Sequence, residues 1–243
     1  MLRRLLPLGV FGPTLMVAGC LMTSIGVEHP NLVRSMDFGQ PQIVHLCVYL
    51  DDGISEATAR QLLASWDEQA NAFKLAVQVS SYQALPRNAF FHQALLDEIV
   101  AQPLAPNCDR ALYFVNRELG DFVWGDLLAL ALPMPEVLGE VDDATFTHGF
   151  VVAKRLSLNQ LVLSPYLTTR HELYHLMGCR RHFDMPNCYQ SIRALKRREQ
   201  VLLAKGVSLK LKEAPFYPTW DGYSDSTLDS RQAVNEVLNE RAD

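Results

Sequence analysis

Three residues between positions 171 and 175 have the types and the spacing that metal-assisted hydrolysis requires. His171 and His175 are four positions apart, so on a helix both imidazoles project from one face and can reach the same metal ion. Glu172 projects toward the neighbouring sector, where its carboxylate can contact water without ligating the metal. Because histidine nitrogens in this arrangement typically bind zinc, the pattern predicts Zn²⁺ as the cofactor and both histidines as ligands.

The same three residues predict a reaction. Zinc lowers the pKa of water and polarises a carbonyl group, so a nearby carboxylate can accept the water proton while the oxygen attacks the carbonyl carbon. Glu172 is therefore the predicted catalytic residue, and its role is that of the general base in a hydrolase.

A catalytic zinc site has three protein ligands, so a third is needed besides the two histidines. Gly178 comes three residues after His175 and allows the chain to turn back, and His182 lies just beyond that turn. In the metzincins, a family of zinc peptidases whose signature this segment resembles, a glycine at this place lets the chain return a third histidine to the zinc, so the resemblance implies His182 as the third metal ligand. Glu199 on the next predicted helix is the alternative, since the gluzincins, a group of zinc peptidases, use a glutamate on a following helix.

The histidines must be held by a helix, which the sequence predicts at 164–177. Ser164 is a typical N-cap, and Pro165 suits the first helical position, where its missing N–H is not needed. Periodicity predicts further helices at 56–73, 90–101, 191–205 and 227–241, and strands at 44–50, 75–81, 110–115 and 148–154. The alternation of strands and helices predicts a mixed, partly parallel sheet with packed helices.

The segment from His171 to His182 resembles the metzincin signature, H-E-x-x-H-x-x-G-x-x-H. Among the metzincins it resembles the archaemetzincins, whose signature continues into a cysteine-containing loop. Residues 122–125 and 149–153 also resemble segments that precede the archaemetzincin zinc helix. The resemblance covers about residues 120–191. It implies a zincin-like α+β fold, a Zn²⁺ cofactor and a zinc metallopeptidase that cleaves a peptide or protein substrate.

The sequence departs from that signature at two places. Arg181 stands where the third histidine is expected, and arginine has no lone pair for a metal, so His182 takes the role with one extra loop residue. The family also has a methionine turn in a Cys-x-Met context, where this chain has Cys188 and then Gln190. These departures favour an alternative, a non-catalytic lipoprotein binding module on a zincin scaffold. A zinc amidohydrolase that acts on a cell-wall amide is a further alternative.

The first twenty residues indicate export and lipid attachment. Arg3 and Arg4 precede an apolar stretch that proline and glycine interrupt, and small residues lead to Cys20. This pattern resembles a bacterial lipobox and predicts a signal peptide at 1–19, acylation (palmitate) of Cys20, a tether at 20–41 and a metallopeptidase domain at 42–243. Leu21 in place of aspartate points to the outer membrane of the cell envelope, facing the periplasm.

Four further cysteines suit an exported protein. Their even number in an oxidising compartment predicts two disulfides, for which three pairings can be drawn. We favour Cys179 with Cys188, which flank one loop, and Cys47 with Cys108. The alternative is a structural zinc site formed by Cys179, His182 and Cys188.

Composition limits the other classes of function. The chain has 243 residues, 49% of them hydrophobic and 20% charged, which is typical of one globular catalytic domain. Its 22 Lys and Arg against 27 Asp and Glu give a net charge of −5, which argues against a nucleic-acid partner. The lipid anchor is the predicted contact with a membrane, and no feature of the sequence indicates an oligomeric state.

Overall fold

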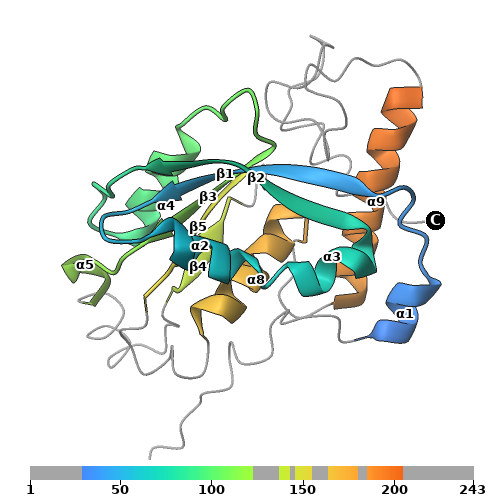
Figure 1. Ribbon diagram of the computed structural model, residues 1–243, viewed down its shortest axis with the longest axis horizontal. Coiled ribbons are helices and arrows are strands. Elements are labelled where there is room, and N and C mark those ends of the chain that lie inside the picture. Colours follow the sequence, from blue (N-terminus) through green and yellow to red (C-terminus); the bar gives the residue numbers. More distant parts are fainter. Residues whose placement is uncertain (1–28, 123–136, 143–145, 155–163, 180–184, 205–243) are drawn as a thin grey trace, which may run out of the picture.

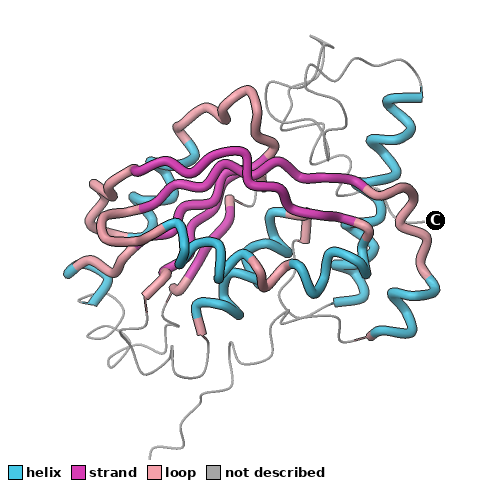
Figure 2. Tube along the Cα trace, in the orientation of Figure 1, coloured by secondary structure: helices cyan, strands magenta, loops and turns pink. Residues whose placement is uncertain are grey.

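The computed structural model describes residues 29–122, 137–142, 146–154, 164–179 and 185–204. Five strands form one sheet in the order β2-β1-β3-β5-β4 (Figures 1 and 2). The strands are β1 (Gln42–Leu50), β2 (Leu75–Ala84), β3 (Arg110–Val115), β4 (Gly139–Val141) and β5 (His148–Val152). All pairs are parallel except β4 with β5, which is antiparallel. This mixed, mostly parallel sheet confirms the predicted α+β architecture.

Helices cover the two faces of the sheet, because alternate residues of each buried strand point to opposite sides. One face packs on α2 (Glu56–Leu63), α3 (Asp67–Phe73), α8 (Pro165–Leu176) and α9 (Met185–Ala204), and its core includes Val44, Leu46, Val48, Leu112, Phe114 and Val151. The other face packs on α4 (His92–Val100) through Ala111, Tyr113, Val115, Phe150 and Val152. The predicted zinc helix therefore belongs to the larger of the two cores.

The helix predicted at 56–73 is wrong as one element, since the structure divides it into α2 and α3. Trp66 lies between them, fully buried, and its indole Nε1 donates a hydrogen bond to the Leu75 carbonyl at 2.9 Å. The break also frees the Ser65 carbonyl, which accepts a 3.0 Å hydrogen bond from Arg170 Nε of α8. Tertiary contacts that the local periodicity does not record therefore end α2 early.

Two further boundaries differ from the sequence prediction. Helix α9 begins at Met185 rather than at 191, so Cys188 and Gln190 lie on its first turns and not in a loop. The residues predicted as tether include α1 (Pro30–Ser35), and both Val33 of this helix and Phe38 beyond it are buried in the main core. The packed part of the chain therefore begins before residue 42. The signal peptide, Cys20 and the helix predicted at 227–241 lie outside the described residues.

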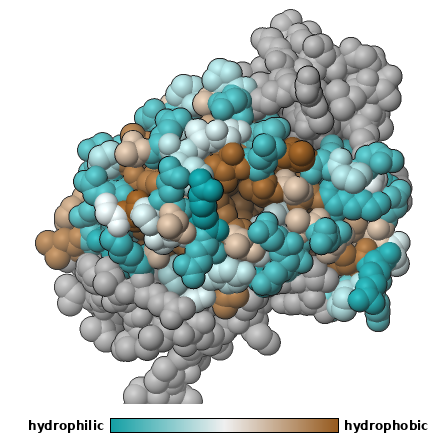
Figure 3. All heavy atoms as spheres, in the orientation of Figure 1, coloured by the Kyte–Doolittle hydropathy of each residue, from teal (hydrophilic) through white to brown (hydrophobic). Residues whose placement is uncertain are grey.

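Partly buried apolar side chains continue the larger core to the surface at the β2 edge of the sheet. They include Val77, Val79 and Tyr82 of β2. Figure 3 shows apolar atoms gathered around this strand and also at the end of the molecule that carries α5 (Leu119–Phe122), where Leu119 is 68% exposed. Among the residues that the structure describes, no helix has both the length and the apolar composition needed to cross a membrane.

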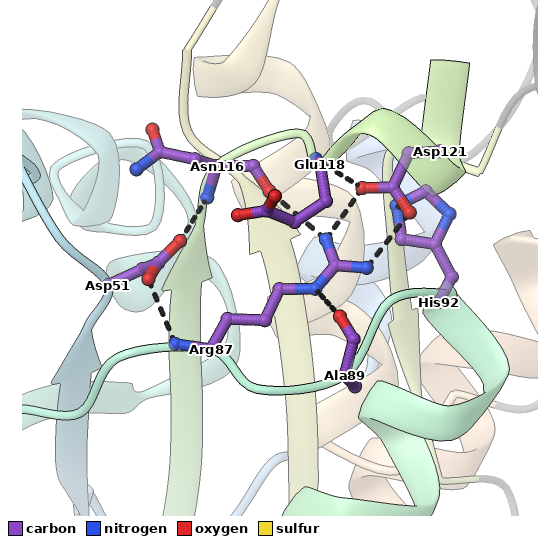
Figure 4. Close-up of polar contacts among 7 residues, drawn as sticks. All are labelled: Asp51, Arg87, Ala89, His92, Asn116, Glu118 and Asp121. Carbon is purple, nitrogen blue, oxygen red and sulfur yellow. Dashed lines mark hydrogen bonds and ion pairs between the residues drawn. The ribbon is translucent and has the colours of Figure 1, made fainter. Parts of the chain in front are cut away.

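A buried ion pair and its hydrogen bonds lie at the carboxyl ends of β1 and β3 (Figure 4). The Arg87 guanidinium donates to both carboxylate oxygens of Asp121, at 2.6 and 2.9 Å, and both side chains are fully buried. Asp51, directly after β1, accepts the backbone N–H groups of Arg87 and Asn116 at 2.9 Å each. Burial raises the pKa of Asp121, but hydrogen bonds from His92 and Arg87 outweigh it and hold that pKa well below its usual range. These contacts fix the loop after β2 and helix α5 to the sheet.

Candidate metal centre

Helix α8 has the boundaries that the sequence predicts, with a specific cap at each end. At its start, the Ser164 hydroxyl accepts the backbone N–H of Leu167 at 3.3 Å, and Pro165 occupies the first helical position. At its end, Gly178 adopts a φ of 101°, which a residue with a side chain rarely takes. The N–H of Gly178 donates to the His175 carbonyl and that of Cys179 to the Tyr174 carbonyl, so the last turn closes in a Schellman arrangement.

Polar side chains fix α8 in the core along its whole length. Arg170 donates to the Ser65 carbonyl, and the Tyr174 hydroxyl donates to Gln69 Oε1 at 2.8 Å. Arg110 of β3 is fully buried, and its Nε donates to the Leu176 carbonyl in the last turn at 2.8 Å. A cation suits this position because the carboxyl end of a helix carries partial negative charge. The helix is therefore held by α2, α3 and the sheet, and its histidines cannot shift freely.

The two histidines converge on one point. His171 Nε2 and His175 Nε2 are 3.1 Å apart, and the rings cross at 76° with 4.7 Å between their centroids. Two nitrogens that ligate one tetrahedral zinc at about 2.0–2.1 Å are about 3.3–3.4 Å apart. The observed separation is close to that value, so the pair fits a zinc ion with little movement of either ring.

A hydrogen bond to a backbone carbonyl determines which nitrogen of His175 is available. Its Nδ1 lies 2.5 Å from the Cys179 carbonyl oxygen. Because a carbonyl oxygen can only accept, Nδ1 carries the proton and the lone pair is on Nε2, which faces His171. This is the arrangement typical of a metal-binding histidine, whose second nitrogen donates to a carbonyl or carboxylate.

Glu172 follows His171 in the sequence and is only 4% exposed. Its side chain packs against Gly139 of the edge strand β4, where an added Cβ would meet Glu172 Cγ and Oε1 at 2.7 Å each. Burial, followed by the negative charge of Glu140 on the same strand, raises the pKa of Glu172 well above its ordinary value. A carboxylate in such surroundings accepts a proton more readily than one in water, as a general base must.

The predicted third ligands are not placed. His182 lies outside the described residues, and Glu199 belongs to α9 at a point where only the backbone is described. Within the described ranges, no three His, Cys, Asp or Glu side chains form a group that could hold a metal ion. The pair of His171 and His175 is thus the part of the site that the structure brings together, and the third ligand stays a prediction.

Both disulfides that the sequence analysis favours are present. Cys179 pairs with Cys188, which joins the end of α8 to the start of α9, and Cys47 pairs with Cys108. The alternative zinc site with Cys179 and Cys188 as ligands is therefore wrong, because sulfurs joined to each other are no longer thiolates.

Arg110, Gly139 and Glu140 contribute to the site without having been recognised in the sequence. Arg110 is a charged residue at the start of a buried strand, and this position only weakly indicates that its side chain holds the end of α8. Gly139 and Glu140 carry no local signal, because their role comes from the approach of β4 to α8.

Comparisons with known proteins give only weak structural similarity. No protein-family model matches the chain, and no curated protein sequence matches it. Among solved structures, the chain is similar to archaemetzincin from Methanopyrus kandleri, with a TM-score of 0.37 and 16% sequence identity over 80% of this chain and 95% of that chain.

Substituting Gly139 by alanine tests the contact with Glu172. Gly139 is not among the glycines with positive φ, so the cost of Gly139→Ala comes from the new methyl group against Glu172. We expect the free energy of unfolding to fall by about 1–3 kcal/mol, as for other overpacked sites. In a Glu172→Ala background the same substitution should cost almost nothing. Equal losses in both backgrounds, measured by urea denaturation, would contradict the contact.

Proposed function

We propose that this protein is a zinc-dependent hydrolase of peptide bonds, with His171 and His175 among its metal ligands and Glu172 as its general base. The observation that carries the proposal is the convergence of the two Nε2 atoms, 3.1 Å apart, beside a buried carboxylate. The protonated Nδ1 of His175 supports it, because that tautomer presents the Nε2 lone pair to the metal. A pair of histidines on the surface of an ordinary helix would need neither feature.

Each residue has a distinct task in this reaction. Bound zinc would supply a lowered pKa for water and would polarise the substrate carbonyl. Glu172 takes the proton from water, holds it in its buried position beside β4, and delivers it to the departing amine. His171 and His175 serve as ligands, and the anchored helix α8 keeps them at a fixed distance from the base.

A metal-binding experiment tests the ligands. We expect the purified full-length chain to hold one zinc ion per molecule, and His171→Ala or His175→Ala to abolish binding, as measured by metal analysis after dialysis. His182→Ala should also lose zinc, because the third ligand is proposed to be His182. Retention of zinc by His182→Ala with loss by Glu199→Ala would assign the third ligand to Glu199 instead.

Replacing the general base separates metal binding from catalysis. Glu172→Gln should keep the fold and the zinc, since Glu172 does not share the ligand face, but glutamine cannot accept a proton. The rate of peptide hydrolysis should fall on the order of 10²–10⁴-fold. Casein or a peptide library can serve as the first substrate. Equal cleavage by both proteins would contradict the mechanism, and a wild type that binds zinc but cleaves no peptide would favour the binding module or the amidohydrolase.

We further propose that the protein is anchored to the outer membrane, facing the periplasm, through acylated Cys20. The lipobox-like residues before Cys20 support this, and so do the two disulfides, which persist in oxidising compartments. Nine residues separate Cys20 from α1 at Pro30, and they reach at most about 30 Å when extended. Such a short span would keep the catalytic domain next to the membrane surface.

Lipid labelling tests the anchor. Cells that express the chain and are fed radiolabelled palmitate should incorporate the label into the protein, and membrane fractions should contain it. Cys20→Ser should remove both the label and the membrane association, whereas Cys47→Ser/Cys108→Ser, which removes two other cysteines, should leave them unchanged. A label that persists in Cys20→Ser would refute acylation at this residue.

A further inference from the structure

We propose that the Cys179–Cys188 disulfide is a positioning element of the metal centre, because it holds the Cys179 carbonyl that keeps His175 in its metal-binding tautomer. The inference rests on the proposed function, and it identifies what prepares one ligand for zinc before zinc arrives. The sulfurs of Cys179 and Cys188 are bonded to each other and are not thiolate ligands, so the disulfide would act through His175.

The link from the disulfide to the ligand is one peptide unit long. His175 Nδ1 lies 2.5 Å from the carbonyl oxygen of Cys179, the residue whose sulfur is bonded to Cys188. The N–H of Cys179 is held as well, since it donates to the Tyr174 carbonyl at 3.1 Å. The direction of the Cys179 carbonyl then depends on the backbone torsion after Cα, at the residue that the disulfide anchors.

The far end of the disulfide is attached to a fixed frame. Cys179 and Cys188 are each 1% exposed, and Cys188 lies on the first turns of α9 beside the fully buried ring of Tyr189. Farther along α9, the buried Lys196 Nζ donates to the Phe73 and Lys74 carbonyls at 2.8 Å each. Helix α9 is thus tied to α3 independently of the disulfide, so the disulfide transfers that rigidity to Cys179.

Losing this restraint would change the chemistry of His175. In a neutral imidazole, the ring nitrogen that faces a hydrogen-bond acceptor carries the proton. In His175 that nitrogen is Nδ1, and the acceptor is the Cys179 carbonyl. With the carbonyl free to turn away, the proton could move to Nε2, and a protonated Nε2 has no lone pair for a metal. Loss of such an outer contact typically lowers metal affinity about 10- to 100-fold.

The second disulfide provides a matched control. Cys47 lies on β1, and Cys108 lies two residues before β3 begins at Arg110. Cys47 alternates along the strand with Val48, which belongs to the larger core, so this bond lies on the opposite face of the sheet from α8. It closes a sequence separation of 61 residues, against 9 for Cys179–Cys188. Loop-closure entropy grows with that separation, so the control bond should contribute more to stability of the fold. A merely structural role predicts the larger effect for Cys47–Cys108 in every measurement.

The test compares the full-length wild type with Cys179→Ser/Cys188→Ser and with Cys47→Ser/Cys108→Ser. Serine replaces both partners each time, so neither variant gains a free thiol that could bind zinc. Histidine ¹⁵N NMR of the zinc-free proteins reports the tautomer of His175, assigned with His175→Gln, and competition with a chelating dye reports zinc affinity. We expect only Cys179→Ser/Cys188→Ser to lose the Nδ1–H signature and to bind zinc about 10- to 100-fold more weakly. Cys47→Ser/Cys108→Ser should unfold at lower urea concentration yet keep the wild-type tautomer and affinity.

Several outcomes would overturn the proposal. One is a Cys179→Ser/Cys188→Ser protein that folds and keeps the wild-type tautomer and affinity, and another is an equal loss of affinity in both double variants. Should the serine variant fail to fold, Cys179→Val/Cys188→Ala fills the buried site with apolar groups and is measured in its place. The wild-type spectrum alone can also refute the proposal, because a proton on Nε2 of His175 would show that the Cys179 carbonyl does not hold the proton on Nδ1. Because the tautomer is measured without zinc, this result stands apart from whether the chain binds zinc at all.

Discussion

The structure depends on burying a helix that is rich in polar residues. Helix α8 carries the proposed ligands and base, and its buried residues include Thr169, Arg170, Glu172 and His175 as well as Leu173 and Leu176. Burying a polar group without a partner is costly, so α8 can lie in the core only if specific partners meet it. Ser65 and Gln69 supply those partners from the α2–α3 segment, and Arg110 supplies one from the sheet. The break between α2 and α3 is thus a consequence of placing α8.

The same anchoring gives the site its precision. A metal centre requires ligands whose positions are fixed before the metal binds, because each side chain that must be ordered on binding reduces the affinity. Here the helix is tied to the sheet at its carboxyl end, and the following residues return to its last turn through the Gly178 and Cys179 N–H groups. The Cys179 carbonyl then orients the His175 ring through a hydrogen bond to Nδ1, the nitrogen on the far side from His171. Fold and site therefore share one set of contacts.

Local chemistry could be predicted from the sequence, and long-range packing could not. The strand at Arg110–Val115 and the capped helix with His171 and His175 are confirmed with almost the predicted bounds, because alternation, a serine cap and a terminal glycine act within a few residues. The disulfide pairs followed from sequence proximity and export. The division of 56–73 and the early start of α9 depend on residues that are distant in the sequence, such as Arg170. The packing of Phe38 likewise depends on Phe73, and the centroids of the two rings are 5.3 Å apart. Gly139 beside Glu172 likewise has meaning only once β4 is placed.

Two buried carboxylates show how the surroundings divide structural from chemical roles. Asp121 meets a bidentate arginine, the N–H of Glu118 and His92, so its pKa is lowered and it stays charged at any ordinary pH. Glu172 is removed from water with the carboxylate of Glu140 as its charged neighbour, so its pKa is raised. A carboxylate held by several donors stabilises the fold but is a poor proton acceptor, whereas a desolvated one beside like charge gains from accepting a proton. A bound zinc ion would add positive charge near Glu172 and oppose this rise in pKa, which would favour the charged carboxylate that must accept a proton from water.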